Sequence, residues 1–134
     1  MPAFVEVLNS FELSYVETMC WSSTDDNGTN FDSCEYASTE FAADTITRIK
    51  EDCFKFRTLA DAAFESFNAS SDDYPINPRQ FHVAHDFWLT RNRHGAGFWD
   101  GDYPEPLATK LTDLAHSFGE QDLYIGDDGT FYLA

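Results

Sequence analysis

A single run of apolar side chains constrains the fold of this chain more than any other feature. Between residues 42 and 67, apolar residues recur at alternating steps of four and three, the spacing of one face of an α-helix. These positions are Ala42, Ile46, Ile49, Cys53, Phe56, Ala60, Ala63 and Phe67. Ser38 is a candidate N-cap, and Glu40 lies where the helix dipole favours an acid. The pattern predicts a long scaffold helix that begins near Ser38.

The other side of this predicted helix is also partly apolar. Phe54, Leu59 and Phe64 lie off the main stripe, so we expect the helix to be covered on more than one side. The polar stretch 68–74 should end it.

Residues 2–21 are apolar but ambiguous. The spacing of Phe4, Val7, Leu8 and Phe11 would suit a helix. The alternation of Phe11, Leu13 and Tyr15 would suit a strand. A helix capped by Ser10 would instead turn Leu13, Val16 and Cys20 inward. We favour the helix, and the turn-forming residues of 22–37 predict a loop after it.

The run 77–80 (Asn-Pro-Arg-Gln) has the residue types of a helix start, with Asn as the cap. Its predicted inward face is Phe81, Ala84, His85, Trp88 and Leu89. This helix should extend to about Asn92 and end at Gly95 and Gly97, which permit backbone angles that other residues avoid.

A third helix should begin near Pro106 and stop at Gly119, after a short strand at residues 98–100. Its inward face would be Leu107, Leu111, Leu114, Ala115 and Phe118.

The chain should finish in a β-hairpin. A three-residue loop, 127–129, with Gly129 left-handed would pair Ile125 with Phe131 and Leu123 with Leu133. Two strands alone are marginal, so we expect residues 98–100, the N-terminus or a helix to support them. The sequence thus predicts one α+β domain, residues 1–134, with three to four helices packed on a small antiparallel sheet with a C-terminal hairpin.

Charge is unevenly distributed along the chain, whose net charge is −16. Residues 1–47 carry nine acids and no base, residues 48–93 carry seven of each, and residues 94–134 carry eight acids and one base. Such a chain repels phosphate backbones, which disfavours direct nucleic-acid binding, and it would attract a basic protein surface. Solubility or adaptation to salt explains the same acidity without any partner.

Several features bear on the cellular setting. No apolar run is long enough for a membrane span, and no signal peptide is expected. The three cysteines, Cys20, Cys34 and Cys53, are an odd count without metal-site spacing, which is typical of free thiols in a reducing cytoplasm.

One helix face could combine imidazoles with carboxylates. His82, His85 and Asp86 fall at i, i+3 and i+4, and His94 and Asp100 follow nearby, so a metal or acid–base site is conceivable. No nucleophile or metal-binding signature accompanies them, and the apolar face places His85 in the core. We therefore expect no catalysis, metal or cofactor.

The arginines and tryptophans of the same region have structural interpretations. Arg91 should offset the helix dipole and pair with Asp25, Asp26 or Asp100. Trp88 and Trp99 are most simply core residues. The dense central motif consists of His85, Asp86, Trp88, Arg91, Asn92, His94, Gly95, Gly97 and Trp99.

Four motifs together resemble a family of small proteins of bacterial viruses and prophages. They are Trp-Ser-Ser-Thr-Asp-Asp at 21–26, His-Asp-Phe-Trp-Leu-Thr-Arg-Asn at 85–92, His-Gly-Ala-Gly-Phe-Trp-Asp at 94–100 and Asp-Asp-Gly at 127–129. Their order and spacing cover nearly the whole chain. Members of that family more often have glycine where Arg93 stands, so the local basicity is a departure. The resemblance implies a phage accessory protein in the bacterial host cytoplasm and no particular mechanism.

Three functional hypotheses remain. The favoured one is a non-enzymatic, anti-defence inhibitor, a DNA mimic that covers a basic, nucleic-acid-binding host or defence protein. Its acidic surface would be Asp25, Asp26, Asp32, Asp100, Asp102, Asp122, Asp127 and Asp128. The second is a small enzyme or metal-binding protein that uses His85, Asp86, His94 and Asp100. The third is a structural phage protein, and the oligomeric state stays open in all three.

Overall fold

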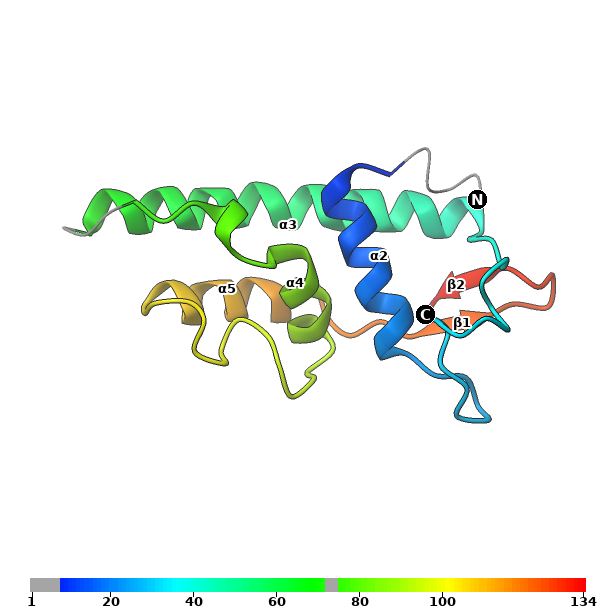
Figure 1. Cartoon of the computed structure of the whole chain (residues 1–134). Coiled ribbons are helices and arrows are strands. Elements are labelled where there is room, and N and C mark those ends of the chain that lie inside the picture. Colours follow the sequence, from blue (N-terminus) through cyan, green and yellow to red (C-terminus); the bar gives the residue numbers. More distant parts are fainter. Residues whose placement is uncertain (1–7, 72–74) are drawn as a thin grey trace. The chain divides into compact units, whose positions relative to one another are not determined.

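The computed structural model describes residues 8–71 and 75–134 (Figure 1). These residues contain four α-helices, a 3₁₀ turn and one pair of antiparallel strands, which confirms the predicted α+β class. The elements are α2 (Ser10–Ser22), α3 (Ala43–Ser70), η1 (Pro78–Gln80), α4 (Val83–Arg91), α5 (Leu107–His116), β1 (Leu123–Ile125) and β2 (Phe131–Leu133). None of the described helices is both long and apolar enough to span a membrane.

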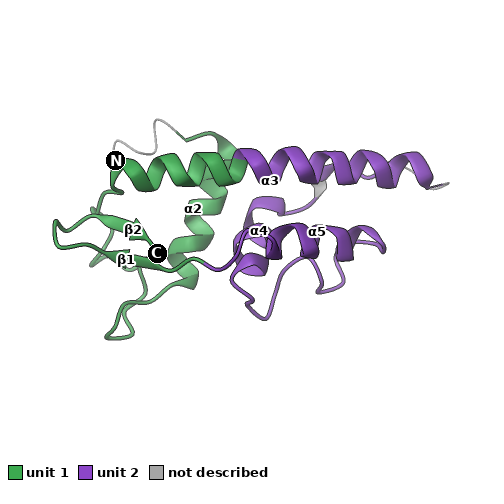
Figure 2. Cartoon of the chain, turned by 180° about the vertical axis from the view of Figure 1, so that it is seen from behind, with its two compact units in different colours: residues 1–53, 121–134 green, residues 54–120 purple. Residues whose placement is uncertain are grey.

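The chain divides into two compact units (Figure 2). Unit 1 comprises residues 1–53 and 121–134, and unit 2 comprises residues 54–120. The first part of helix α3, up to Cys53, belongs to unit 1, and the rest of the helix belongs to unit 2. The assignment of residues 1–134 to one domain stays a prediction.

In unit 1, α2 begins at a reciprocal capping box. The Asn9 side chain accepts a hydrogen bond from the backbone N–H of Glu12 (2.8 Å), and the Glu12 carboxylate accepts one from Asn9 N–H (2.9 Å). The predicted helix is confirmed, but the cap is Asn9 and not Ser10, because the acid three residues after Asn9 completes the box.

The buried face of α2 also differs from the prediction. Tyr15, Val16 and Met19 are buried, whereas Leu13 and Cys20 are only half-buried. The buried face of α2 is therefore rotated from the predicted one by about one residue. It carries the large Tyr15 and Met19 side chains in place of Leu13 and Cys20.

The start of α3 is fixed by the C-terminal hairpin of unit 1. Phe131 N–H donates to the Glu40 carbonyl (2.9 Å), Ala42 N–H donates to the Phe131 carbonyl (3.1 Å), and Phe41 forms a parallel bridge with Phe131. Residues 40–42 are thus held extended beside β2, and α3 begins at Ala43. The prediction of Ser38 as the N-cap is wrong, because a partner 90 residues away binds this backbone.

The hairpin has the predicted register. Leu123 pairs with Leu133 and Ile125 with Phe131, and Gly129 has a φ of 81° in the three-residue loop. Its support comes from residues 40–42 and from the Thr45 hydroxyl at the start of α3, which donates to the Phe131 carbonyl (2.9 Å). Of the other expected supports, residues 98–100 form a turn and no strand, and the N-terminal residues 1–7 lie outside the described part of the chain.

The apolar stripe of α3 is confirmed along most of its length. Its buried members are Ile49, Cys53, Phe56, Ala60 and Ala63. Phe64 is buried as well, but Phe54 and Leu59 are 73% and 45% exposed, so covering on a second side is wrong at those two positions. The helix extends to Ser70, and residues 72–74 of the predicted breaker lie outside the described residues.

Unit 2 has an aromatic core. The rings of Phe56 and Phe87 stack with centroids 3.9 Å apart, and Phe98 and Phe118 lie against Phe56 at 5.7 and 5.9 Å. Helix α5 adds the buried side chains Leu107, Ala108, Leu111 and Ala115, and Gly119 follows it with a φ of 78°. The predicted third helix and its glycine stop are confirmed.

The entry into α4 takes two steps. The Asn77 side chain accepts from Arg79 N–H (3.0 Å) and starts the 3₁₀ turn η1, after which α4 begins only at Val83 with His82 as N-cap. A continuous helix from Asn77 is therefore wrong. The break places Phe81 against Tyr103, with ring centroids 4.4 Å apart.

Helix α4 ends at Arg91, and the left-handed residue after it is Arg93 (φ 58°), not a glycine. His94 N–H donates to the Leu89 carbonyl (2.9 Å) across this turn. Gly97, with a φ of 151°, then passes so close to Thr90 that an added Cβ would lie 2.2 Å from its hydroxyl oxygen. Gly97 is structural as predicted, whereas Gly95 has open space around it.

Candidate functional site

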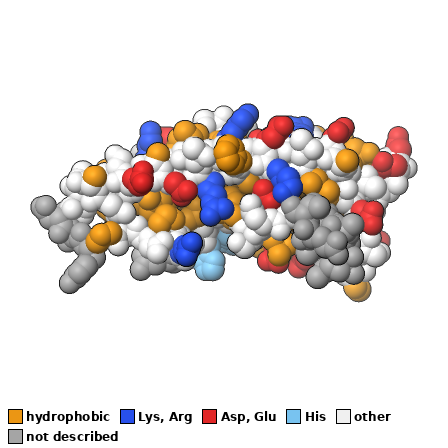
Figure 3. Space-filling view, turned by 90° about the horizontal axis from the view of Figure 1, so that it is seen from above, with side chains coloured by type: hydrophobic (Ala, Val, Ile, Leu, Met, Phe, Trp, Pro, Cys, Tyr) orange, Lys and Arg blue, Asp and Glu red, His pale blue; other side chains and the backbone are white. Residues whose placement is uncertain are grey.

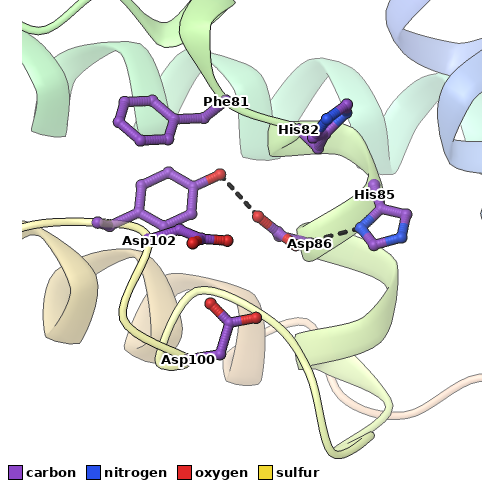
Figure 4. A pocket seen from close by; sticks show the side chains of 7 residues that line it. Phe81, His82, His85, Asp86, Asp100 and Asp102 are labelled. Atoms are coloured by element: carbon purple, nitrogen blue, oxygen red, sulfur yellow. Dashed lines mark hydrogen bonds and ion pairs between the residues drawn. The ribbon is translucent and has the colours of Figure 1, made fainter.

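Unit 2 contains a pocket of about 300 Å³ at the start of α4 (Figure 4). The loop that carries Asp100 and Asp102 faces the first turn of the helix across it. Its lining residues are Phe81, His82, His85, Asp86, Asp100, Asp102 and Tyr103. The pocket therefore combines three carboxylates and two imidazoles with two aromatic rings.

Asp86 is the most buried carboxylate of this pocket, with 7% of its surface exposed. The Tyr103 hydroxyl donates to its Oδ2 (2.7 Å), and His85 Nδ1 lies 3.2 Å from its Oδ1. Its position in the first turn of α4 adds the favourable end of the helix dipole. These contacts hold Asp86 in one orientation at the pocket wall.

Burial dominates the acid–base properties of Asp86. Loss of solvent raises its pKa above the ordinary 3.8, while the hydrogen bonds from Tyr103 and His85 act in the opposite direction. Burial also raises the pKa of Tyr103, and the hydrogen bond to Asp86 adds to that rise. Tyr103 therefore stays a neutral hydrogen-bond donor at physiological pH.

The structure brings together part of the predicted His–Asp cluster. His82, His85, Asp86 and Asp100 line the pocket, whereas His94 is exposed and is not among the lining residues. The expectation that His85 is a core residue is wrong, because 34% of its side chain is exposed at the pocket. The break between η1 and α4 sets the direction of this first turn.

Sequence reasoning missed Phe81 and Tyr103 as members of this site and assigned Asp102 only to a general acidic surface. Tyr103 lies 17 residues after Asp86, beyond the reach of any helical period. The short spacing of Asp100, Asp102 and Tyr103 in one loop was the available signal, but it did not indicate a partner.

The donors of the pocket do not converge as metal ligands. Among residues 8–71 and 75–134, no group of three or more His, Cys, Asp or Glu side chains has a geometry that could hold a metal ion.

The central motif has clear structural roles at Arg91 and Trp88, both nearly fully buried. Arg91 donates from Nε to the Gly119 carbonyl (2.9 Å) and from Nη2 to the Phe118 carbonyl (3.1 Å), and its guanidinium lies 5.4 Å from the Phe87 ring centroid. It thus binds carbonyls just beyond α5, and its predicted pairing with an aspartate stays a prediction. Asn92 donates to the Trp88 carbonyl (3.0 Å). Trp99, expected in the core, is 52% exposed.

The predicted acidic surface is divided between the two units. Asp100 and Asp102 belong to the pocket of unit 2. The remaining six, all in unit 1, are Asp25, Asp26, Asp32, Asp122, Asp127 and Asp128.

Two of these carboxylates organise the loops that carry them. Asp25 accepts from the backbone N–H groups of Asn27 and Thr29 (2.8 Å each) and from the Tyr36 hydroxyl. Asp128 accepts from Thr130 and from the Tyr132 hydroxyl (2.6 Å) in the hairpin loop. In each case the tyrosine hydrogen bond is the main cause of a pKa below the ordinary 3.8.

Aromatic side chains join the two acidic segments within unit 1. Phe131 of β2 contacts Phe31, Phe41 and Tyr36, with ring centroids 5.2, 5.1 and 6.1 Å apart. The loop that carries Asp25 and Asp32 is therefore anchored on the same strand pair as the acidic hairpin loop. Residues about 100 positions apart in sequence belong to one folded surface.

Unit 1 holds most of the net charge. Its 67 residues carry fourteen acids and two bases, a net charge of −12, whereas the 67 residues of unit 2 carry ten acids and six bases, a net charge of −4. The acidity is not uniform over the molecule, because the face drawn in Figure 3 shows Lys and Arg side chains among the Asp and Glu side chains.

Two features of the described residues stand out as candidates for function, the acidic surface of unit 1 and the pocket at the start of α4 in unit 2. No protein-family model, curated protein or solved structure matches the chain.

Proposed function

We propose that this protein is a non-enzymatic binding protein whose unit 1 presents carboxylates to a basic surface on another protein. Ten carboxylates are exposed among the described residues of unit 1. They are Glu17, Asp26, Asp32, Glu35, Glu40, Asp44, Glu51, Asp122, Asp127 and Asp128. The two bases of this unit have partners within it: Lys50 pairs with Glu12 (3.0 Å), and Arg48 lies 3.5 Å from the Leu133 carbonyl.

The observation that carries this proposal is the aromatic cluster around Phe131. It fixes two acidic loops on one unit, so their charges act together on one partner. The hydrogen bonds of Asp25 and Asp128 restrain the same loops before any partner arrives. Preorganised loops lose less conformational entropy on binding than flexible ones.

The expected energetics are those of electrostatic attraction. An exposed carboxylate contributes little by itself, typically under about 1 kcal/mol. Ten of them create a field that speeds the approach of a basic partner, and salt screens this field over roughly 8–10 Å. The same field repels phosphate backbones, which makes a protein the fitting partner.

The resemblance to phage proteins suggests the biological setting. In that setting the protein would act in the bacterial host cytoplasm and cover the nucleic-acid-binding surface of a host or defence protein, as a DNA mimic and inhibitor. Carboxylates spaced over a folded surface can occupy the arginines and lysines that would otherwise contact phosphates.

The test begins with capture of partners from host lysate on the immobilised protein, with washes of increasing salt. Association rates of the purified partner are then measured for a unit 1 variant in which Asp26, Asp32 and Glu35 become amides. A matched control converts three exposed acids of unit 2, Asp61, Glu65 and Asp113, to amides. Both variants lose three charges and keep Asp25 and Asp128.

At about 50 mM salt, the unit 1 variant should associate several-fold more slowly than the wild type, and the control should associate almost normally. This difference should shrink as salt rises, because screening removes the long-range attraction. Equal slowing by both variants would contradict a localised binding surface. Submicromolar binding of duplex DNA by the protein itself at the same salt would contradict the charge argument.

A further inference from the structure

We propose that the pocket of unit 2 binds a small organic cation that carries an ammonium or guanidinium group. The pocket presents Asp86 from one side and Asp100 and Asp102 from the facing loop (Figure 4). This site is independent of the acidic surface of unit 1 and belongs to the other unit.

The charged side chains of the pocket favour a positively charged ligand over a negatively charged one. Three carboxylates face a cavity of about 300 Å³, with two histidines as the titratable groups of opposite sign. Asp86 is only 7% exposed, so water screens the charge of its carboxylate poorly. A cation placed here would restore the solvation that burial removes, whereas an anion would be repelled.

Asp86 retains capacity to accept a hydrogen bond from a ligand. A carboxylate has about four acceptor positions, and the structure describes Tyr103 on Oδ2 and His85 on Oδ1. These two contacts orient the group without using all of those positions. The arrangement is that of a positioned acceptor at the wall of a cavity.

The geometry favours an organic cation over a metal ion. The described His, Cys, Asp and Glu side chains form no group of three suited to a metal, so the carboxylates are spread and not convergent. Spread acceptors suit the several N–H donors of an ammonium or guanidinium group. Phe81 and Tyr103, stacked 4.4 Å apart with an interplanar angle of 27°, add aromatic surface of the kind that binds such cations.

The cavity volume limits the ligand to a small group. It lies at the lower end of the roughly 300–1,000 Å³ that ligand pockets occupy. Two sources of the same chemistry fit: a free alkylamine or guanidine, and an arginine or lysine side chain of another polypeptide. Two probes distinguish them, agmatine for the free compound and N-acetyl-arginine-N-methylamide for the side chain.

The experiment is a two-dimensional amide NMR titration of the full chain with each probe at physiological salt. Agmatine should produce saturable shifts at residues 81–86 and 100–103, with a Kd in about the millimolar range or below. Asp102→Asn should weaken binding by about five-fold or more, because it removes one carboxylate from the wall. Asp102 is exposed, so this variant should fold normally.

The matched control is Asp113→Asn, which removes the same charge from an exposed position of α5 in the same unit, outside the pocket. It should leave the Kd almost unchanged. Asp86→Asn tests the buried carboxylate of the pocket directly. If the Asp86→Asn protein does not fold, Asp102→Asn still tests the proposal. Neutral 1-butanol, which has a similar chain without the charge, should cause no saturable shift.

Shifts with agmatine alone would support a free small cation, and shifts with both probes would support recognition of a side chain. The absence of saturation with both probes up to about 10 mM would overturn the proposal. Equal weakening by Asp102→Asn and Asp113→Asn would also overturn it, because binding would then reflect net charge and not the pocket. Both results are independent of whether unit 1 binds a basic partner.

Discussion

The same contact, a tyrosine hydroxyl that donates to an aspartate, occurs in both units with opposite consequences. In unit 1, Tyr36 binds Asp25 and Tyr132 binds Asp128, and both carboxyl pKa values lie below the ordinary 3.8. In unit 2, Tyr103 binds Asp86, whose pKa lies above 3.8. The hydrogen bond stabilises the carboxylate in all three pairs, and burial of Asp86 reverses the net result.

This difference matches how the two units use their polar residues. Unit 1 keeps most of its described acids in contact with water, and tyrosines and backbone N–H groups shape the loops that carry Asp25 and Asp128. Glu12 is the buried exception, and it pairs with Lys50. Unit 2 places a carboxylate and a guanidinium inside, at Asp86 and Arg91, and satisfies each with specific partners. The first arrangement suits long-range attraction, whereas the second suits a defined pocket and a rigid core.

The largest stability effect should occur at Gly97, in the turn after α4. In unit 2, Gly97→Ala forces a Cβ to within 2.2 Å of the Thr90 hydroxyl oxygen at a φ of 151°, and it disturbs the bond from Phe98 N–H to that oxygen. We expect a loss of about 2–4 kcal/mol in the free energy of unfolding, measured by urea denaturation.

Two other glycines provide the controls for this experiment. Gly28 in the acidic loop of unit 1 has a φ of 83° but open space, so Gly28→Ala should cost about 1 kcal/mol from backbone strain alone. Gly95, with neither a positive φ nor a close neighbour, should tolerate alanine within about 0.5 kcal/mol. Similar losses at Gly97 and Gly95 would contradict the tight turn in unit 2.

A smaller effect of opposite sign is expected at Arg93. This residue has a φ of 58°, a conformation in which glycine is preferred, and its contact with Glu120 is 4.0 Å long and exposed. Arg93→Gly should therefore stabilise the protein by up to about 1 kcal/mol, seen as a higher midpoint in urea. A clear destabilisation would show that the Arg93 side chain does more for unit 2 than its described contact indicates.

The most direct test of the Tyr–Asp comparison replaces the phenol in each unit. Tyr36→Phe should raise the pKa of Asp25 toward 3.8, because its main stabilising hydrogen bond is lost. Tyr103→Phe should raise the pKa of Asp86 further away from 3.8, because the larger of the two hydrogen bonds that lower it is lost and burial then meets less opposition. Carboxyl NMR titration measures both shifts. A wild-type Asp86 pKa below 3.8 would contradict the dominance of burial.

The same pKa directions predict how the free energy of unfolding depends on pH. This effect should be the smallest of those predicted here. Asp25 has a lowered pKa, so its contribution is present above the unfolded value of 3.8 and is lost as the pH falls through the folded value. Asp86 has a raised pKa, so the folded state holds its proton more tightly and stability declines as the pH rises above 3.8 toward the folded value. Asp86→Asn should remove that decline in urea unfolding measured across this pH window.

Much of the local structure could be predicted from residue types alone. The stripe through Ile49, Phe56 and Ala63 identified α3, and Gly119 marked the end of α5. The Asp-Asp-Gly loop gave the register of the hairpin. Each of these features depends on residues close in sequence, through helical periodicity or turn geometry.

The errors arose where distant residues compete with local preferences. Ser38 has the residue type of a cap, but backbone pairing of Glu40 and Ala42 with Phe131 delays the helix to Ala43. The position of Trp99 after a glycine-rich turn gave no sign of its exposure. Burial depends on what packs against a residue, which a local pattern does not report.

The candidate sites show the same division. The sequence by itself determined the strong acidity of residues 1–47 and the closeness of His82, His85 and Asp86 on one turn, since charge and helical spacing are local properties. Tertiary structure decided that Phe131 unites the two acidic loops and that Tyr103 meets Asp86. Those contacts join residues up to 100 positions apart, and burial by such distant residues raises the pKa of Asp86, while Asp25 and Asp128 in the loops of unit 1 have lowered pKa values.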